Sequence, residues 1–140
     1  QYIVTLRGDP RAAVPGVAVH AFDDPGGLTA RLHAAAARFG VTAEAAGHHA
    51  GEVETSIMLA LHPELVRTEA FAPGYVDPVG DAQALFYPDL RRHAPNGTVG
   101  DPCTSTALRG ARYLAAWVDV LEAAFLDAKK SAYAAGTKTP

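Results

Sequence analysis

Residues 16–40, GVAVHAFDDPGGLTARLHAAAARFG, decide the fold class that we expect for this chain. Residues 16–22 are almost continuously apolar, which is typical of a strand covered on both faces in a parallel sheet. Asp, Pro and Gly residues then predict a turn. In residues 28–39 apolar side chains recur at three- and four-residue steps, which predicts a helix. Residues 2–6 are β-branched and predict another strand. Interleaved strands and helices favour an α/β fold.

Two further helices are expected downstream of this unit. The first covers residues 57–61 and stops before Pro63. The second is strongly periodic from Leu108 to Phe125, and Thr104 and Ser105 are candidates for its N-cap. Between the two helices, residues 71–88 contain several Pro and Gly residues. They predict a long irregular loop, a kind of segment that tends to carry function in compact domains.

Composition narrows the function classes. The chain has 140 residues, of which 49% are hydrophobic and 19% charged, and this balance is typical of one globular domain. The net charge of -3 offers no basic excess for nucleic acid, and no apolar run approaches the roughly 20 residues of a membrane span. The single cysteine, Cys103, excludes an internal disulfide and favours a reducing compartment, the cytoplasm. Because the chain begins with Gln1 rather than Met, we expect a fragment.

The densest polar cluster is His48, His49, Glu52 and Glu54, which lies between a glycine-containing loop and an apolar helix. Imidazole nitrogens and carboxylate oxygens together are the ligands of zinc, manganese and iron(II) sites. A simpler interpretation remains open, because acidic residues in a first turn also complement the helix dipole. Four such residues on one short segment rarely fill the coordination shell of a metal. Further ligands would have to come from elsewhere.

Residues 49–56, HAGEVETS, resemble the HAGExETS signature of the creatininase family of metal-dependent amide hydrolases. Residues 57–66, IMLALHPELV, are also similar to that family, as are residues 96–102, NGTVGDP, followed by a long helix containing Gly110. Two motifs in the right order and rough spacing make the resemblance specific from about Val17 onward. It extends to the branch of creatinine amidohydrolase-like proteins that includes the mycofactocin-system peptidases.

The resemblance implies a role for each motif residue. His49 would be the catalytic acid and base, Glu54 would be a metal ligand, and Glu52 is a weaker candidate that would contact the ligands. Residues 100–102 would shape a wall of the site. The family fold implies a sheet flanked by helices on both faces. The cofactor implied is a divalent metal (zinc, manganese or iron), with two ions in the complete site. The substrate would be a small-molecule amide or a short peptide, and the protein would form a homo-oligomer.

The chain also departs from the family pattern. A Glu-x-His element, an Asp and an Asn-Gly-His-Gly-Gly-Asn loop, which supply further ligands in the family, do not occur here. We therefore expect residues 1–128 to be the C-terminal portion of one creatininase-like domain with an incomplete sheet, and residues 129–140 to be a flexible tail. The alternative function is that of a catalytically incomplete remnant or a binding subunit. A third possibility is a hydrolase that uses Cys103 near a helix N-terminus as its nucleophile.

The remaining polar and aromatic residues have ordinary structural interpretations. His20 fits a hydrogen-bonded core position, and Trp117 fits the core or a subunit interface. Three aromatic residues of the long loop are candidates for lining a pocket or anchoring the loop: Tyr75, Phe86 and Tyr87. Three histidines fit surface positions: His33, His62 and His93.

Overall fold

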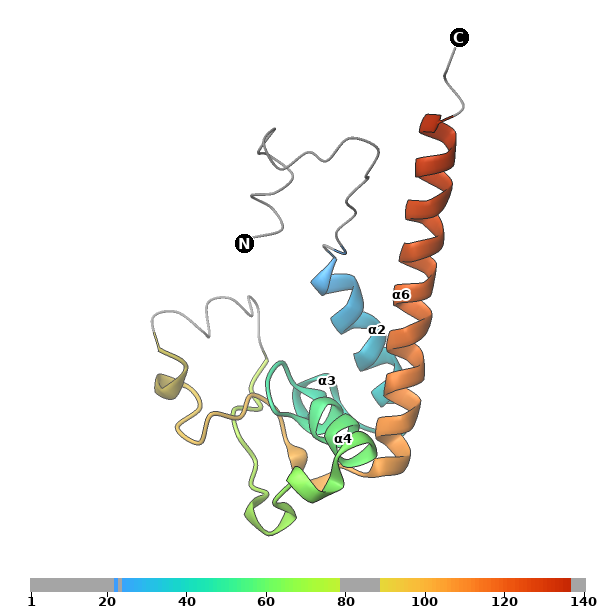
Figure 1. The fold of residues 1–140 in the computed structure, drawn as a ribbon. Helices are drawn as coiled ribbons and strands as arrows, with labels where there is room; N and C mark the ends of the chain where they lie inside the picture. The colour runs from blue at the N-terminus through green and yellow to red at the C-terminus, as the bar shows by residue number, and fades with distance from the viewer. Residues whose placement is uncertain (1–21, 23, 79–88, 137–140) are drawn as a thin grey trace.

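A computed structural model describes residue 22, residues 24–78 and residues 89–136 of the chain (Figure 1). The main helices are α2 (Pro25–Ala37), α3 (Ala43–Ala46), α4 (Glu52–Leu61) and α6 (Ala107–Gly136). Short 3-10 turns connect them: η2 (Pro63–Leu65), η3 (Thr68–Ala70), η4 (Leu90–Arg92) and η5 (Pro102–Thr104). Helix α6 runs along one side of the molecule and reaches well beyond the other described helices, with α2 alongside it (Figure 1).

The expectation of an α/β fold with a sheet flanked by helices is wrong for these residues. They are mainly helical, and their extended pairing is limited to two isolated bridges around Val99, antiparallel to His49 and parallel to Tyr75. Gly100 follows Val99 and Gly74 precedes Tyr75, and glycine weakens a strand, which fits the shortness of this pairing. The predicted strands at residues 2–6 and 16–22 lie outside the described residues, apart from residue 22.

The predicted helices are confirmed, with corrected ends. Helix α2 begins where the Asp24 side chain accepts a hydrogen bond from Gly27 N at 2.8 Å. Helix α4 stops before Pro63 as predicted but begins earlier, at Glu52. Neither Thr104 nor Ser105 caps α6. Thr106 Oγ1 accepts from Arg109 N at 3.2 Å, so Thr104 and Ser105 lie two positions and one position too early.

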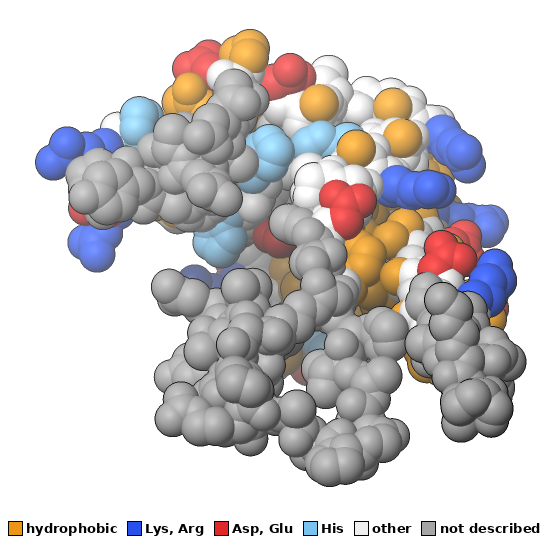
Figure 2. Space-filling view, turned by 90° about the horizontal axis from the view of Figure 1, so that it is seen from above, with side chains coloured by type: hydrophobic (Ala, Val, Ile, Leu, Met, Phe, Trp, Pro, Cys, Tyr) orange, Lys and Arg blue, Asp and Glu red, His pale blue; other side chains and the backbone are white. Residues whose placement is uncertain are grey.

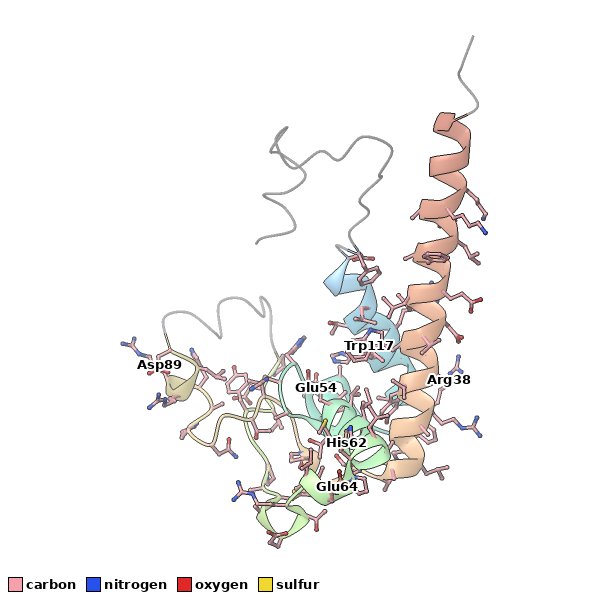
Figure 3. All side chains as sticks on the ribbon, in the orientation of Figure 1. Arg38, Glu54, His62, Glu64, Asp89 and Trp117 are labelled. Carbon is pink, nitrogen blue, oxygen red and sulfur yellow. The ribbon has the colours of Figure 1, made fainter. Side chains whose placement is uncertain are left out.

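The core lies where α2, α4 and α6 meet. Its fully or nearly fully buried members come from all three helices and from α3: Ala36, Ala46, Val53, Ile57 and Tyr113. Trp117 packs against this cluster on the side of α6 that faces α2, which confirms the core interpretation (Figure 3). Because small alanine side chains form much of the contact, the helices approach closely and little apolar volume fills the space between them.

Helices α4 and α6 cross at Gly110. A Cβ atom built on Gly110 would overlap the carbonyl oxygen of Ser56 and lie 2.8 Å from Ile57 N. Both neighbours are backbone atoms, so no side-chain rotation could make room for it. The glycine that accompanied the second motif in the sequence therefore sets the distance between the two helices.

The outer part of α6 leaves apolar side chains in solvent. Large hydrophobic residues stay exposed along it: Leu108, Val118, Leu121, Phe125 and Leu126. The helix continues through Lys129 and Lys130 to Gly136, so most of the stretch expected to be a tail is helical. None of the helices in the described part of the chain has the length and apolar character needed to cross a membrane.

Candidate functional site

Backbone hydrogen bonds join the two sequence motifs into one wall. Val99 N donates to His49 O at 2.8 Å, and His48 N donates to Val99 O at 2.9 Å. Asp101 N donates to Ala45 O at 2.9 Å, just ahead of the first motif. Segments separated by about fifty positions in the sequence are thereby held in register. The second motif acts as a support on which the turn before α4 is built.

This close approach requires glycine at two positions. Gly47 has φ +79° and Gly100 has φ +139°, which are backbone conformations that L side chains rarely adopt. A Cβ atom on Gly47 would overlap Val99 O, and one on Gly100 would lie 2.7 Å from the Cα atom of Gly51. Gly47, just ahead of the first motif, and Gly100 of the second motif therefore allow backbone to pack directly on backbone beside the candidate catalytic residues.

Glu54 occupies the third position of α4 and faces away from α6 (Figure 3). Its Oε2 accepts a hydrogen bond from Ala50 N at 2.6 Å, a charge-assisted bond to an amide that precedes the helix. Ala50 itself has φ +52°, and Thr55 Oγ1 donates to its carbonyl oxygen at 3.2 Å. The Glu54 carboxylate is thus held at the positive end of the helix dipole. The simpler interpretation of this residue, a capping role, is therefore met by the geometry.

A pocket of about 450 Å³ opens beside Glu54. Its apolar lining includes Met58, Leu65, Val66 and Phe71, and its polar lining includes Thr55, Arg67, Asn96 and Thr98. Pro102 also lines it, so the second motif contributes a wall as expected. Of the long loop predicted to be functional, Phe71 and Ala72 take part in this pocket. Phe86 and Tyr87 lie outside the described residues.

A second pocket, of about 300 Å³, lies around His48 and His33 and is also lined by Glu44, Tyr75 and Asp77. The two imidazole rings are 5.4 Å apart in an edge-to-face arrangement. Burial, and then the neighbouring His33, lower the pKa of His48, so its neutral form is favoured. Histidine side chains gather on the face of the molecule seen in Figure 2, beside acidic and hydrophobic ones.

The surface interpretation of His33 was wrong. Its ring is half-buried, and its Nε2 donates to the carbonyl oxygen of Gly47 at 2.9 Å, so α2 supports the turn that carries the first motif. The helical pattern gave no signal for this contact, because His33 lies about 100° around the helix from Leu32 and off the centre of its apolar face. His62 and His93 are exposed as expected, and His20 lies outside the described residues.

The structure places the three motif residues in different surroundings. His49 has an exposed side chain, and its backbone amide and carbonyl both pair with Val99. Glu54 lines the larger pocket, whereas His49 lines neither of the two pockets described above. Glu52 lies on the opposite side of α4 and is fully buried against α6. His49 precedes α4 and Glu54 lies in its first turn, whereas Glu52 is buried against α6.

The described residues do not fit a complete metal site. Within residues 24–78 and 89–136, no group of three or more His, Cys, Asp or Glu side chains converges on a point where a metal ion could bind. One carboxylate oxygen of Glu54 already accepts a hydrogen bond from Ala50 N. A catalytic metal usually takes three protein ligands. This part of the chain can therefore supply a metal ligand but not a full coordination shell.

Cys103 does not have the properties of an activated nucleophile. Its side chain is exposed. A hydrogen bond with Asp101, together with the charge of that carboxylate, raises the pKa of the thiol. The α6 helix begins at Ala107, too far along the chain to counter this effect. A thiol with a raised pKa is protonated at neutral pH and is a poor nucleophile.

Comparisons with known proteins point to the family that the two sequence motifs resemble. The family model for creatininase (creatinine amidohydrolase) matches residues 12–125. Among curated relatives, a mycofactocin precursor peptide peptidase from Mycobacterium ulcerans is 40% identical over 76 residues, which are 51% of this chain and 29% of the relative. A peptidase of the same name from Mycobacterium tuberculosis is 41% identical with the same coverage. The matched part thus spans less than a third of these relatives. No solved structure matches the chain.

Proposed function

This chain belongs to the creatininase family, and on that premise we propose that it takes part in hydrolysing an amide C–N bond in a small molecule or a short peptide. The observation that carries the proposal is the joining of the two family motifs, residues 49–56 and 96–102, through hydrogen bonds around Val99. The names of the mycobacterial relatives support the short-peptide alternative for the substrate.

His49 would transfer the proton in this reaction. Its backbone is fixed on both sides by Val99, so its position does not depend on the exposed ring. An imidazole can donate a proton near neutral pH, and the nitrogen that leaves a broken amide bond needs one. We infer that His49 protonates this nitrogen. Its exposed ring is accessible to a substrate approaching from the turn before α4.

Glu54 would hold a divalent metal together with ligands from outside the described residues. Creatininases are generally dependent on divalent metals, and zinc, manganese and iron all accept oxygen and nitrogen donors. One Glu54 oxygen accepts from Ala50 N, and such a hydrogen bond orients a carboxylate that also binds a cation.

We also propose that the whole protein is a cytoplasmic homo-oligomer.

Hydrolysis of a panel of substrates tests the proposal. The panel contains creatinine and short peptides, the protein is supplied with zinc, manganese or iron(II), and released amine is measured. We expect the wild-type protein to be active and Glu54→Gln to lower its activity by at least about 10- to 100-fold, because that is the loss when an outer-shell partner of a metal is changed and Glu54 would be a ligand itself. The exposed Glu64→Gln serves as the matched control and keeps the wild-type rate, because Glu64 pairs with the exposed His62 and does not line the pocket beside Glu54.

An alternative function has its own support. The described residues lack a three-ligand cluster, which fits a catalytically incomplete remnant or a binding subunit. Elemental analysis of the purified chain separates the two functions. Metal well below one ion per chain, together with failure to hydrolyse any amide in the whole protein, would favour the binding role.

A further inference from the structure

Glu52 is the first carboxylate of the HAGEVETS motif, yet it is turned away from the pocket beside Glu54. Its side chain is 0% exposed. Oε1 accepts hydrogen bonds from Ser56 Oγ at 3.0 Å and from Arg109 Nη1 at 3.3 Å. We propose that Glu52 is a positioning residue. It couples the first turn of α4 to α6 and thereby fixes the orientation of the Glu54 carboxylate, and its importance for catalysis rests on the function proposed above.

The contacts of Glu52 extend to both sides of the start of α6. Ser56 Oγ, which donates to Glu52, also accepts from Thr106 N at 3.0 Å. Arg109 Nη1 donates to Thr104 O at 3.0 Å as well as to Glu52. Ser105 Oγ donates to the backbone oxygen of Glu52 at 3.1 Å. One carboxylate therefore organises the hydrogen bonds between the first turn of α4 and the segment that enters α6.

Two buried atoms in the same interface have no hydrogen-bond partner among the described residues, Glu52 Oε2 and the hydroxyl oxygen of Tyr113. Tyr113 is 0% exposed, and burial, followed by the Glu52 carboxylate, raises its pKa strongly. A carboxylate oxygen accepts hydrogen bonds, and a protonated phenol donates one. The structure forms no hydrogen bond between these two atoms. The Glu52 carboxylate nevertheless acts on the Tyr113 hydroxyl, because it contributes to the raised pKa of that group.

The geometry of α4 carries this anchoring to Glu54. Glu52 and Glu54 are two positions apart, about 200° around the helix, so they point to opposite sides of one turn. A rotation of that turn that releases Glu52 from α6 must also move Glu54 relative to Ala50. The 2.6 Å bond from Ala50 N to Glu54 Oε2 is short, and its amide proton responds strongly to any change in length. The Ala50 amide is therefore a reporter of the coupling.

The test follows the Ala50 amide by ¹H–¹⁵N NMR in the 140-residue chain, without metal or substrate. Glu54→Ala gives the shift of the broken bond. We expect Glu52→Gln to move the Ala50 proton at least half of the way toward that shift, and Tyr113→Phe to move it in the same direction by less. The exposed Glu122→Gln on α6 is the matched control and leaves the signal in place.

If Glu52→Gln does not fold, Arg109→Lys is the second variant. It keeps a positive charge at a side chain that is 24% exposed, and we expect it to move the Ala50 amide signal in the same direction. A folded Glu52→Gln or Arg109→Lys chain with an unmoved Ala50 amide overturns the coupling, because a merely stabilising role does not reach this reporter. The readout needs no activity, so its failure is distinct from failure of the hydrolytic function. That failure would show as a wild-type protein unable to cleave any amide.

Discussion

Where α4 and α6 cross, Gly110→Ala should have two opposite effects on the free energy of unfolding. Replacing glycine by alanine inside a helix stabilises it by about 1 kcal/mol through propensity. Here the added methyl group would overlap Ser56 O and lie 2.8 Å from Ile57 N. Overpacking of this kind costs about 1–3 kcal/mol, and the upper part of that range applies because both obstacles are backbone atoms. We therefore expect Gly110→Ala to lower the free energy of unfolding by about 2 kcal/mol.

Urea unfolding of the chain, followed by circular dichroism at the helical band, measures this change. Gly26→Ala is the matched control, since it lies in α2 and its added Cβ atom would meet nothing nearer than 4.0 Å. We expect that variant to be as stable as wild type or slightly more stable. A Gly110→Ala chain that is more stable than wild type would refute the close crossing, because propensity would then act alone.

Three further predictions follow from the geometry of single side chains. Arg109→Met removes a charged partner from the fully buried Glu52 and should lower the free energy of unfolding by about 2–3 kcal/mol. The same substitution should lower it by less in a Glu52→Gln chain, and urea unfolding of the single and double variants measures this difference. The pKa of His48 is lowered in the folded chain, so the unfolded chain binds more protons, and the free energy of unfolding should fall as pH drops below about 6.5. His48→Gln should weaken this dependence of stability on pH. An unchanged pH dependence in that variant would contradict His48 as its source. The raised thiol pKa of Cys103 predicts that Ellman's reagent reacts more slowly with it than with free cysteine, and Asp101→Asn should speed the reaction; equal rates in both chains would count against the carboxylate as the cause.

Local patterns predicted the helices well and the architecture poorly. The three- and four-residue recurrence of apolar side chains gives α2 and α6, and Pro63 marks the end of α4. Those signals are local and the structure preserves them. A sheet depends on pairing between distant segments, which a single sequence does not reveal. Around Val99 that pairing stops after one residue on each side.

The candidate site was predictable in composition but not in orientation. The motif placed His49, Glu52 and Glu54 on one short segment, and helix geometry puts two residues that are two positions apart on different sides of a helix. What lies on each side depends on tertiary packing. No local signal pairs Glu52 with Arg109, which is 57 positions away, and none shows that Glu54 lines a pocket while Glu52 is buried.

The most direct test of the proposed chemistry is the rate of amide hydrolysis by the whole protein, supplied with divalent metal, when His49 is replaced by alanine. A proton-transfer residue accounts for about 10²- to 10⁴-fold in rate, so we expect His49→Ala to lower kcat by at least about 100-fold. The neighbouring His48→Ala, which alters the other pocket, should stay within a few-fold of wild type. A His49→Ala protein that keeps kcat within a few-fold of wild type would contradict the assignment of His49 as the proton donor.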